Sequence, residues 1–224
     1  VRYDRLGYVT LQRRFEVGWH ADTWTDEVMM TALDSASTEI ILAGATEPQV
    51  HEASMKKDAD GDRHPVLLFR PGMSAMMEMP DGIMTPIDIF NVRSTEVTIG
   101  PDGMKAMPGD LPANIGYTFC DELTVDEAIV AGAKSVRFDP PVIQYVENFL
   151  SFPAGLSVPN GSYDRELGVW IGEPDGRVIA LLAETNGEAA VDADGDGLED
   201  SDGGAAIGID AAERRVLADR YEAP

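Results

Sequence analysis

The sequence predicts a mainly β fold, an antiparallel β-sandwich with two short helices. Short runs rich in β-branched and aromatic residues recur along the chain, and turn residues such as glycine and proline separate them. Two segments carry the residues that start helices. Hydrophobic residues make up 44% of the 224 residues, near the average for globular proteins, so the chain is long and apolar enough to form a core.

Strands are expected where such runs are bounded by turns. The polar stretch 47–63 is expected to be a hairpin loop, and the turn at residues 80–82 is expected to join the strands on either side of it. The expected strands cover residues 6–17, 27–33, 39–42, 64–69, 74–79, 83–87, 90–99, 117–123, 142–149, 169–171 and 178–182.

Each of the two expected helices begins at a capping signal. Thr124 and Glu127 are expected to form a capping box, in which the Thr124 hydroxyl accepts from the backbone amide of Glu127 and the Glu127 carboxylate reaches back to the backbone amide of Thr124. The helix should stop at Gly132. Asp210 and Glu213 repeat the arrangement before the final helix. This organisation predicts a β segment over residues 1–63, a sandwich core over 64–183, and an acidic loop with a helix over 184–224.

The charge of the chain excludes several classes of partner. There are 40 acidic and 17 basic residues, so the formal net charge is −23. Such a chain repels phosphate, and we therefore expect no binding to nucleic acid. No run approaches the roughly 20 apolar residues of a membrane helix, so no membrane insertion is expected. The first residues show neither a signal-peptide core nor an initiating Met, which favours a piece of a larger chain.

The acidic residues are densest near the C-terminus, where ten acids and no base lie between Arg177 and Arg214. Carboxylates recur there at every second position, as in a calcium loop that must supply six to eight oxygens at about 2.3–2.6 Å. The predicted ligands of a Ca²⁺ ion are Asp192, Asp194, Asp196, the carbonyl of Leu198, Asp200 and Asp202. Gly197 allows the sharp turn. The alternative is an acidic solvated linker, but mutual repulsion among these carboxylates favours a divalent ion.

This loop resembles an EF-hand loop over its first nine positions. At the twelfth position, where a bidentate Glu is expected, the chain has Gly203, and Asp202 stands one residue early. The pattern is closer to the looser loops of thrombospondin type 3 and dockerin-like repeats. A second run, Asp58-Ala-Asp60-Gly-Asp62, continues with Arg63, which spoils coordination. We predict a hairpin turn there, with weak metal binding as the alternative.

The remaining candidates favour structural roles. The single cysteine, Cys120, lies in a strand-like run and is expected to be a buried small apolar residue. His20 and Asp22 are at most half of a catalytic pair. Asn160-Gly161-Ser162 fits a glycosylation sequon, but a tight turn is the preferred interpretation.

One long segment is more distinctive than these motifs. Residues 138–155 run Phe-Asp-Pro-Pro-Val-Ile-Gln-Tyr-Val-Glu-Asn-Phe-Leu-Ser-Phe-Pro-Ala-Gly, and residues 158–165, 169–171 and 175–179 continue the pattern. With residues 106–109, 117–123 and the Asp-rich loop, this order of aromatics and glycines resembles the β-rich region upstream of the repeats in bacterial RHS/YD-repeat proteins. Residues 64–221 carry the resemblance. The alternation after Gly7-Tyr8 loosely resembles the last strands of a transthyretin-like module.

The resemblance implies a structural or adhesive module of a large protein that is secreted or exposed at the cell surface, and it transfers no catalytic residue. The leading hypothesis is a non-enzymatic, calcium-binding module whose partners are neighbouring domains of the same chain. A second hypothesis is a glycan- or peptide-binding module that uses the aromatic pool Tyr145, Phe149, Phe152, Tyr163 and Trp170. A third is a secreted hydrolase that uses an acidic pair or His20 with Asp22.

Overall fold

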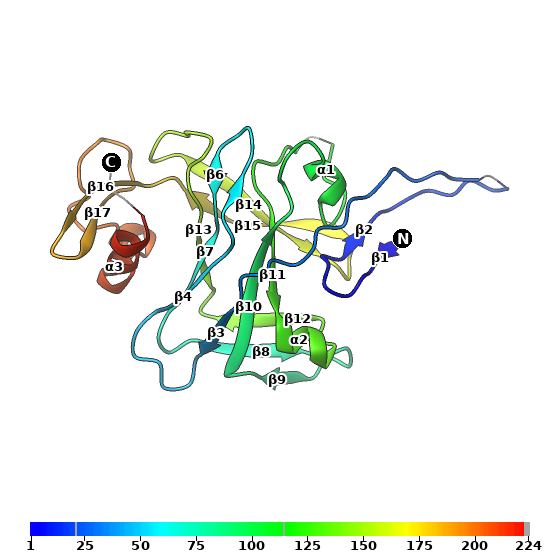
Figure 1. Cartoon of the computed structure of the whole chain (residues 1–224), viewed down its shortest axis with the longest axis horizontal. Coiled ribbons are helices and arrows are strands. Elements are labelled where there is room, and N and C mark those ends of the chain that lie inside the picture. Colours follow the sequence, from blue (N-terminus) through cyan, green and yellow to red (C-terminus); the bar gives the residue numbers. More distant parts are fainter. Residues whose placement is uncertain (21, 114, 222–224) are drawn as a thin grey trace. The chain divides into compact units, whose positions relative to one another are not determined.

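The structure is a computed structural model of the chain, and it describes every residue except 21, 114 and 222–224. The described chain is mainly β, with antiparallel sheets and three short helices, α1 (Gly103–Ala106), α2 (Asp126–Ala131) and α3 (Ala211–Arg220) (Figure 1). This confirms the predicted fold class. The helix α1 and the 3₁₀ helix η1 (Ala205–Ile207) were not predicted. No helix in the described part is long and apolar enough to cross a membrane.

The chain divides into two compact units. Unit 1 comprises residues 1–149 and 163–171, and unit 2 comprises residues 150–162 and 172–224. The strands β14 (Ser157–Asp164) and β15 (Val169–Arg177) pair as a two-stranded ribbon that contributes residues to both units. Of the predicted domain limits, 183/184 falls inside the strand β16 (Ala180–Thr185).

Unit 1 is built from three-stranded antiparallel sheets, with orders β11–β10–β3, β12–β8–β9 and β13–β7–β4 among the described residues. Their strands are β3 (Thr38–Ile41), β4 (Gln49–Glu52), β7 (Val66–Phe69), β8 (Ser74–Glu78), β9 (Met84–Pro86), β10 (Ile89–Glu96), β11 (Asp121–Val125), β12 (Ser135–Asp139) and β13 (Ile143–Tyr145). The two-stranded pairs β1 (Arg2–Tyr3)–β2 (Leu11–Gln12) and β5 (Lys56–Lys57)–β6 (Asp62–Arg63) complete it. As predicted, β8 pairs with β9.

Three phenylalanines join these sheets in one core. Phe69 on β7, Phe90 on β10 and Phe138 on β12 each come from a different sheet, and their ring centroids lie 5.7 to 5.8 Å apart. Phe69 and Phe90 are at most 1% exposed. Burial of each such ring stabilises the fold by about 1.5–3 kcal/mol. Sheets that share one apolar core in this way are consistent with a β-sandwich-like architecture.

A smaller apolar cluster surrounds Cys120. Val9, Val97 and Met107 are buried there, and the half-buried Cys120 packs against them. Burial, reinforced by the adjacent carboxylate of Asp121, raises the pKa of the Cys120 thiol to about 12. The thiol therefore stays protonated, and Cys120 is the packing residue that the sequence predicts.

The second Asp-rich motif forms the predicted hairpin, because β5 pairs with β6 across it. Both carboxylate oxygens of Asp58 accept hydrogen bonds from Arg63 at 2.9 Å. The buried Arg63 also donates to Glu96 at 2.7 Å, and its guanidinium lies 4.2 Å from the ring centroid of Phe149. Hydrogen bonds from Arg63 hold the pKa of Asp58 far below its usual range. Arg63 of the same chain thus supplies the positive charge that pairs with Asp58 in this motif.

One of the two predicted capping boxes is wrong. Thr124 lies in β11, and its buried hydroxyl has no hydrogen-bond partner in the described chain. Glu127 accepts instead from the backbone and side-chain amides of Asn91, both at 2.8 Å. The helix α2 nevertheless follows and ends at Gly132, whose φ of +68° forms a left-handed cap. The Asp210 cap is confirmed, because its carboxylate accepts from the amide of Glu213 at 2.8 Å.

Tertiary pairing overrides two loop predictions. Asn160–Ser162 lies inside β14 and not in a turn, which occurs at residues 165–168. The Ser162 hydroxyl donates to Glu173 on β15 at 2.6 Å, a cross-strand contact that is invisible to local patterns. The strand β4 likewise forms within the predicted loop 47–63, because it pairs with β7.

Candidate metal centre

The acidic loop of unit 2 directly follows a β-hairpin. The strands β16 and β17 (Glu188–Asp192) pair antiparallel around Asn186-Gly187, whose φ angles of +54° and +79° suit a tight hairpin turn. The strand β17 was not predicted. It ends at Asp192, which is 2% exposed, so the strand delivers one buried carboxylate to the start of the loop.

Backbone amides orient this first carboxylate. Gly195 and Gly197 donate to the two oxygens of Asp192 at 2.6 and 2.9 Å. Both glycines adopt positive φ, +82° and +81°, and therefore turn the loop back toward Asp192. A Cβ on Gly195 would lie 2.3 Å from the carbonyl oxygen of Ala154, so this part of the loop also packs closely against its own unit.

Asp200 closes the loop. Its amide donates to the carbonyl of Val191 at 2.8 Å, and its carboxylate accepts from the amide of Ala193 at 3.0 Å. These bonds return Asp200 to the end of β17, beside Asp192. Asp194 lies between them in the sequence and is exposed.

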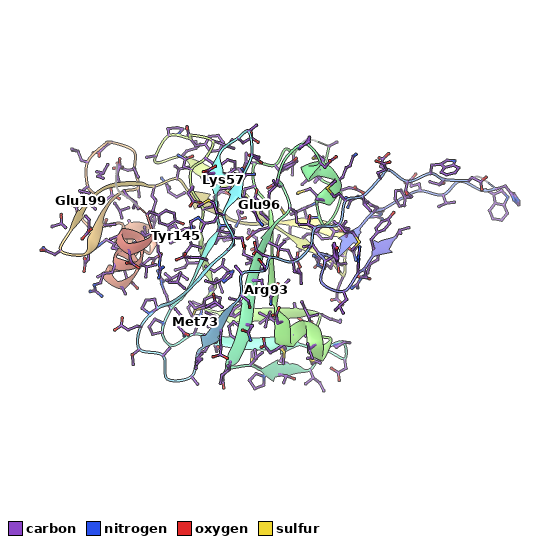
Figure 2. All side chains as sticks on the ribbon, viewed as in Figure 1. Lys57, Met73, Arg93, Glu96, Tyr145 and Glu199 are labelled. Carbon is purple, nitrogen blue, oxygen red and sulfur yellow. The ribbon has the colours of Figure 1, made fainter. Side chains whose placement is uncertain are left out.

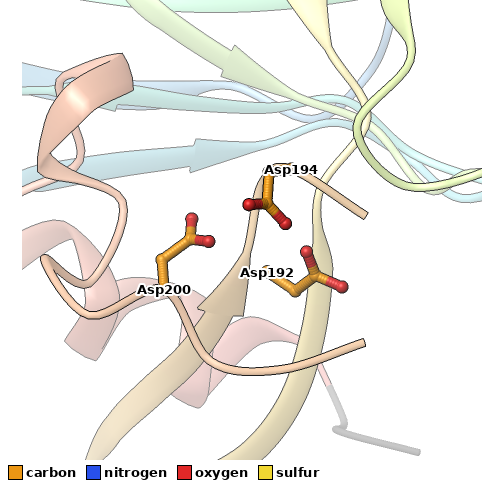
Figure 3. Close-up of side chains that lie close together, drawn as sticks. All are labelled: Asp192, Asp194 and Asp200. Carbon is orange, nitrogen blue, oxygen red and sulfur yellow. The ribbon is translucent and has the colours of Figure 1, made fainter. Parts of the chain in front are cut away.

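Three carboxylates converge as a result. One oxygen each of Asp192, Asp194 and Asp200 lies within 4.8 Å of the other two (Figure 3). Like charges at such separations repel by on the order of 1–4 kcal/mol per pair, depending on solvent screening. The guanidinium of Arg177 donates to the carbonyls of Gly155 and Ala193, and no ion pair joins it to these carboxylates in the described chain. The donor set is hard oxygen, which suits calcium, magnesium or manganese rather than zinc or copper.

The predicted carboxylate ligands Asp196 and Asp202 lie outside this cluster. The Asp196 carboxylate accepts from the amide of Leu198 at 2.8 Å, and the Leu198 side chain is 67% exposed. Asp202 accepts from the amides of Gly204 and Ala206, at 3.0 and 2.8 Å, at the start of η1. Of the five predicted carboxylate ligands, three thus form the cluster and two lie outside it.

The loop continues directly into the last helix. Arg214 of α3 donates to the carbonyl of Gly203 at 3.4 Å and to the carboxylate of Glu188 on β17. The hydrogen bond from Arg214 lowers the pKa of Glu188. Ile209 packs beside Val191 at Gly204, where an added Cβ would approach its side chain to 3.2 Å. A change in the loop is therefore coupled to both β17 and α3.

Several residues of the other two hypotheses make contacts of their own. His20 of unit 1 lies in a turn, with a φ of +55°, and its ring is edge-on to Trp19 at a centroid distance of 5.0 Å. Of the aromatic pool, Phe149 is covered by Arg63, and Tyr163 packs on Trp170 at 5.3 Å. These rings belong to packed clusters rather than to an open platform.

Comparison with known proteins adds no family. No protein-family model, curated protein or solved structure matches this chain.

Proposed function

We propose that this protein is a non-enzymatic structural and interaction module that binds one calcium ion through Asp192, Asp194 and Asp200. The convergence of the three carboxylates within 4.8 Å carries this proposal. Calcium suits the site because it accepts six to eight oxygens in irregular geometry, and loop carbonyls and water can complete the set. Magnesium is less suited, since it demands near-ideal octahedral geometry and keeps most of its water.

The role of the ion would be to stabilise unit 2. Calcium would offset the repulsion among the three carboxylates and fix the loop that connects β17 with α3. The resemblance of residues 64–221 to the region upstream of the repeats in RHS/YD-repeat proteins supports a place in a large exported protein. Neighbouring domains of that chain would be the partners, in a secreted or cell-surface setting.

Calorimetric titration of calcium-free protein tests the proposal. We expect one calcium ion per chain and a rise in the thermal midpoint, with a stabilisation of about 2.7 kcal/mol at a free calcium concentration 100 times Kd. Asp194→Ala should abolish binding. Asp196→Ala is the matched control, because it removes a neighbouring carboxylate that lies outside the cluster and should leave binding intact.

The two variants also separate the competing arrangements. Equal loss of binding in both would indicate the longer, EF-hand-like ligand set that the sequence predicts. Absence of binding heat at millimolar calcium, together with a melt that chelation leaves unchanged, would overturn the proposal altogether.

A further inference from the structure

One carboxylate oxygen in unit 1 is buried without a hydrogen-bond partner. Glu96 ends the strand β10, among the strands of unit 1 (Figure 2), and its side chain is 0% exposed. Its oxygen Oε1 accepts from the guanidinium of Arg63 at 2.7 Å and from the hydroxyl of Thr98 at 2.9 Å. The second oxygen, Oε2, is also buried, and it has no partner in the described chain. Because a buried acceptor without a donor is costly, a donor is expected beside Oε2.

The β10–β11 ladder brings a second carboxyl group to the same face. Asp121 of β11 lies directly opposite Glu96. Opposite residues of an antiparallel pair point to one face of the sheet, with Cβ atoms about 4.5–5.5 Å apart. The hydroxyl of Ser94, two residues before Glu96, donates to Oδ2 of Asp121, so the Asp121 side chain lies over this face of β10. Gln144 of β13 donates to the same oxygen at 2.8 Å, whereas Oδ1 of Asp121 accepts no hydrogen bond from the described residues.

We propose that Glu96 and Asp121 form a proton-binding site, in which Oδ1 of Asp121 carries a proton and donates it to Oε2 of Glu96. The proton comes from water and returns to water, so the only covalent bond formed is the O–H bond of Asp121. The hydrogen bond gives Oε2 its missing donor, and the proton removes the repulsion between two carboxylates on facing strands. One proton thus satisfies both carboxyl groups.

The partners of the two carboxyl groups place the proton on Asp121. Glu96 pairs with the buried cation Arg63 of β6, which also pairs with Asp58. Asp121 accepts hydrogen bonds from neutral side chains only, and no basic side chain pairs with it in the part of the chain that the structure describes. The positive charge on this face therefore belongs to Glu96, and a proton is what neutralises Asp121.

The groups on either side of Asp121 in β11 add to this effect. Glu122 pairs with Arg165 at 2.6 Å, and burial keeps the thiol of Cys120 protonated. Burial, reinforced by the negative charges of Glu122 and Glu96, raises the pKa of Asp121 to about 6. The site therefore fills as the pH falls through about 6 and empties above it.

Occupancy of the site changes how firmly β10 holds β11. The strand β10 is the central strand of its sheet, between β11 and β3. The pair Glu96 and Asp121 ends the β10–β11 register. With the proton bound, a side-chain hydrogen bond closes this end; without it, two like charges face each other across the strands. This end of unit 1 is therefore stabilised by acid and loosened above about pH 6.

Carbon-detected NMR of the whole chain, titrated from about pH 4 to about pH 8, tests the site. The carboxyl carbons of Asp121 and Glu96 should respond together, with one shared midpoint near pH 6. In Asp121→Asn the response of the Glu96 carbon should disappear. Glu122→Gln is the matched control: it removes a neighbouring acid outside the hydrogen bond, so the shared response should persist with a midpoint shifted to lower pH.

Three outcomes would overturn the inference. A Glu96 carbon that does not respond when Asp121 titrates would show that the two groups share no proton, and an ordered water would then be the donor to Oε2. A midpoint of Asp121 near its ordinary 3.8 would exclude the site altogether. A Glu96 response near pH 6 that survives in Asp121→Asn would assign the proton to another group. The first two results come from the wild-type chain, so they do not depend on the folding of a variant.

Discussion

The register of the β10–β11 pair places the carboxyl group of Asp121 where its ionisation is disfavoured. The β10–β11 pairing sets Glu96 directly opposite Asp121. Burial, reinforced by the negative charges of Glu122 and Glu96, raises the pKa of Asp121 from 3.8 to about 6 against the opposing hydrogen bonds from Ser94 and Gln144. The folded protein therefore binds the Asp121 proton more tightly than the unfolded chain does.

Replacement of Asp121 by Asn should stabilise the protein at neutral pH. Because the pKa is raised on folding, the ionised Asp121 costs stability that grows as the pH rises from about 4 to 6 and is complete at pH 7. Asp121→Asn keeps the acceptor for Ser94 and Gln144 and should raise the free energy of unfolding by about 2–3 kcal/mol at pH 7. At pH values below the unfolded pKa the difference should vanish. Urea unfolding from pH 3 to 8 measures it, and a pH-independent difference would contradict this account.

The metal loop depends on two glycines that differ in their surroundings. Gly195 and Gly197 have nearly the same positive φ, so alanine strains the backbone similarly at both, by about 1–2 kcal/mol. A Cβ on Gly195 would also clash with Ala154, whereas nothing lies within 4 Å of the corresponding position on Gly197.

We therefore expect Gly195→Ala to destabilise unit 2 more than Gly197→Ala, by at least about 1 kcal/mol beyond the common backbone cost. Calcium affinity, measured by calorimetry, should fall further in Gly195→Ala because the clash displaces the residue next to Asp194. Equal losses in the two variants would show that only backbone strain matters and that the packing on Ala154 contributes nothing.

The two predicted helices both form, but only one of them has the cap that the sequence predicts. Asp210 caps α3 as its sequence indicates, because its carboxylate accepts from the amide of Glu213. Thr124 pairs with Arg93 across the β10–β11 ladder, and Glu127 is bound by Asn91. Both partners of the expected capping box are thus taken by a neighbouring strand, and the helix follows without it.

For the whole molecule, the acidity is divided between dispersed ion pairs and one uncompensated cluster. In unit 1, Asp58 and Glu96 share the buried Arg63. In unit 2, Asp192, Asp194 and Asp200 have no basic side chain bonded to them among the described residues. An added divalent cation should therefore act on unit 2 and leave the ion pairs of unit 1 unchanged.

Hydrogen exchange followed by mass spectrometry should localise this effect. At calcium 100 times Kd, amides of residues 192–204 and of α3 that exchange through opening of the loop should slow by up to about 100-fold. Amides of β7 and β10 in unit 1 should be unaffected. Uniform protection of both units, or protection that survives in Asp194→Ala, would contradict a site confined to this loop.

The sequence by itself determined the mainly β class, the β8–β9 hairpin, the α3 cap and the location of the acidic cluster, because each is written in contiguous residues whose periodicity, turn or capping chemistry acts locally. The tertiary structure alone decided which of the five proposed carboxylate ligands converge, since that depends on how β17 and Asp200 return to the same point. It also decided that Asn160–Ser162 extends as a strand, whereas residues 13–17 of the predicted strand 6–17 form no strand in the described chain. Pairing between distant segments supplies or withholds hydrogen bonds that no local pattern encodes.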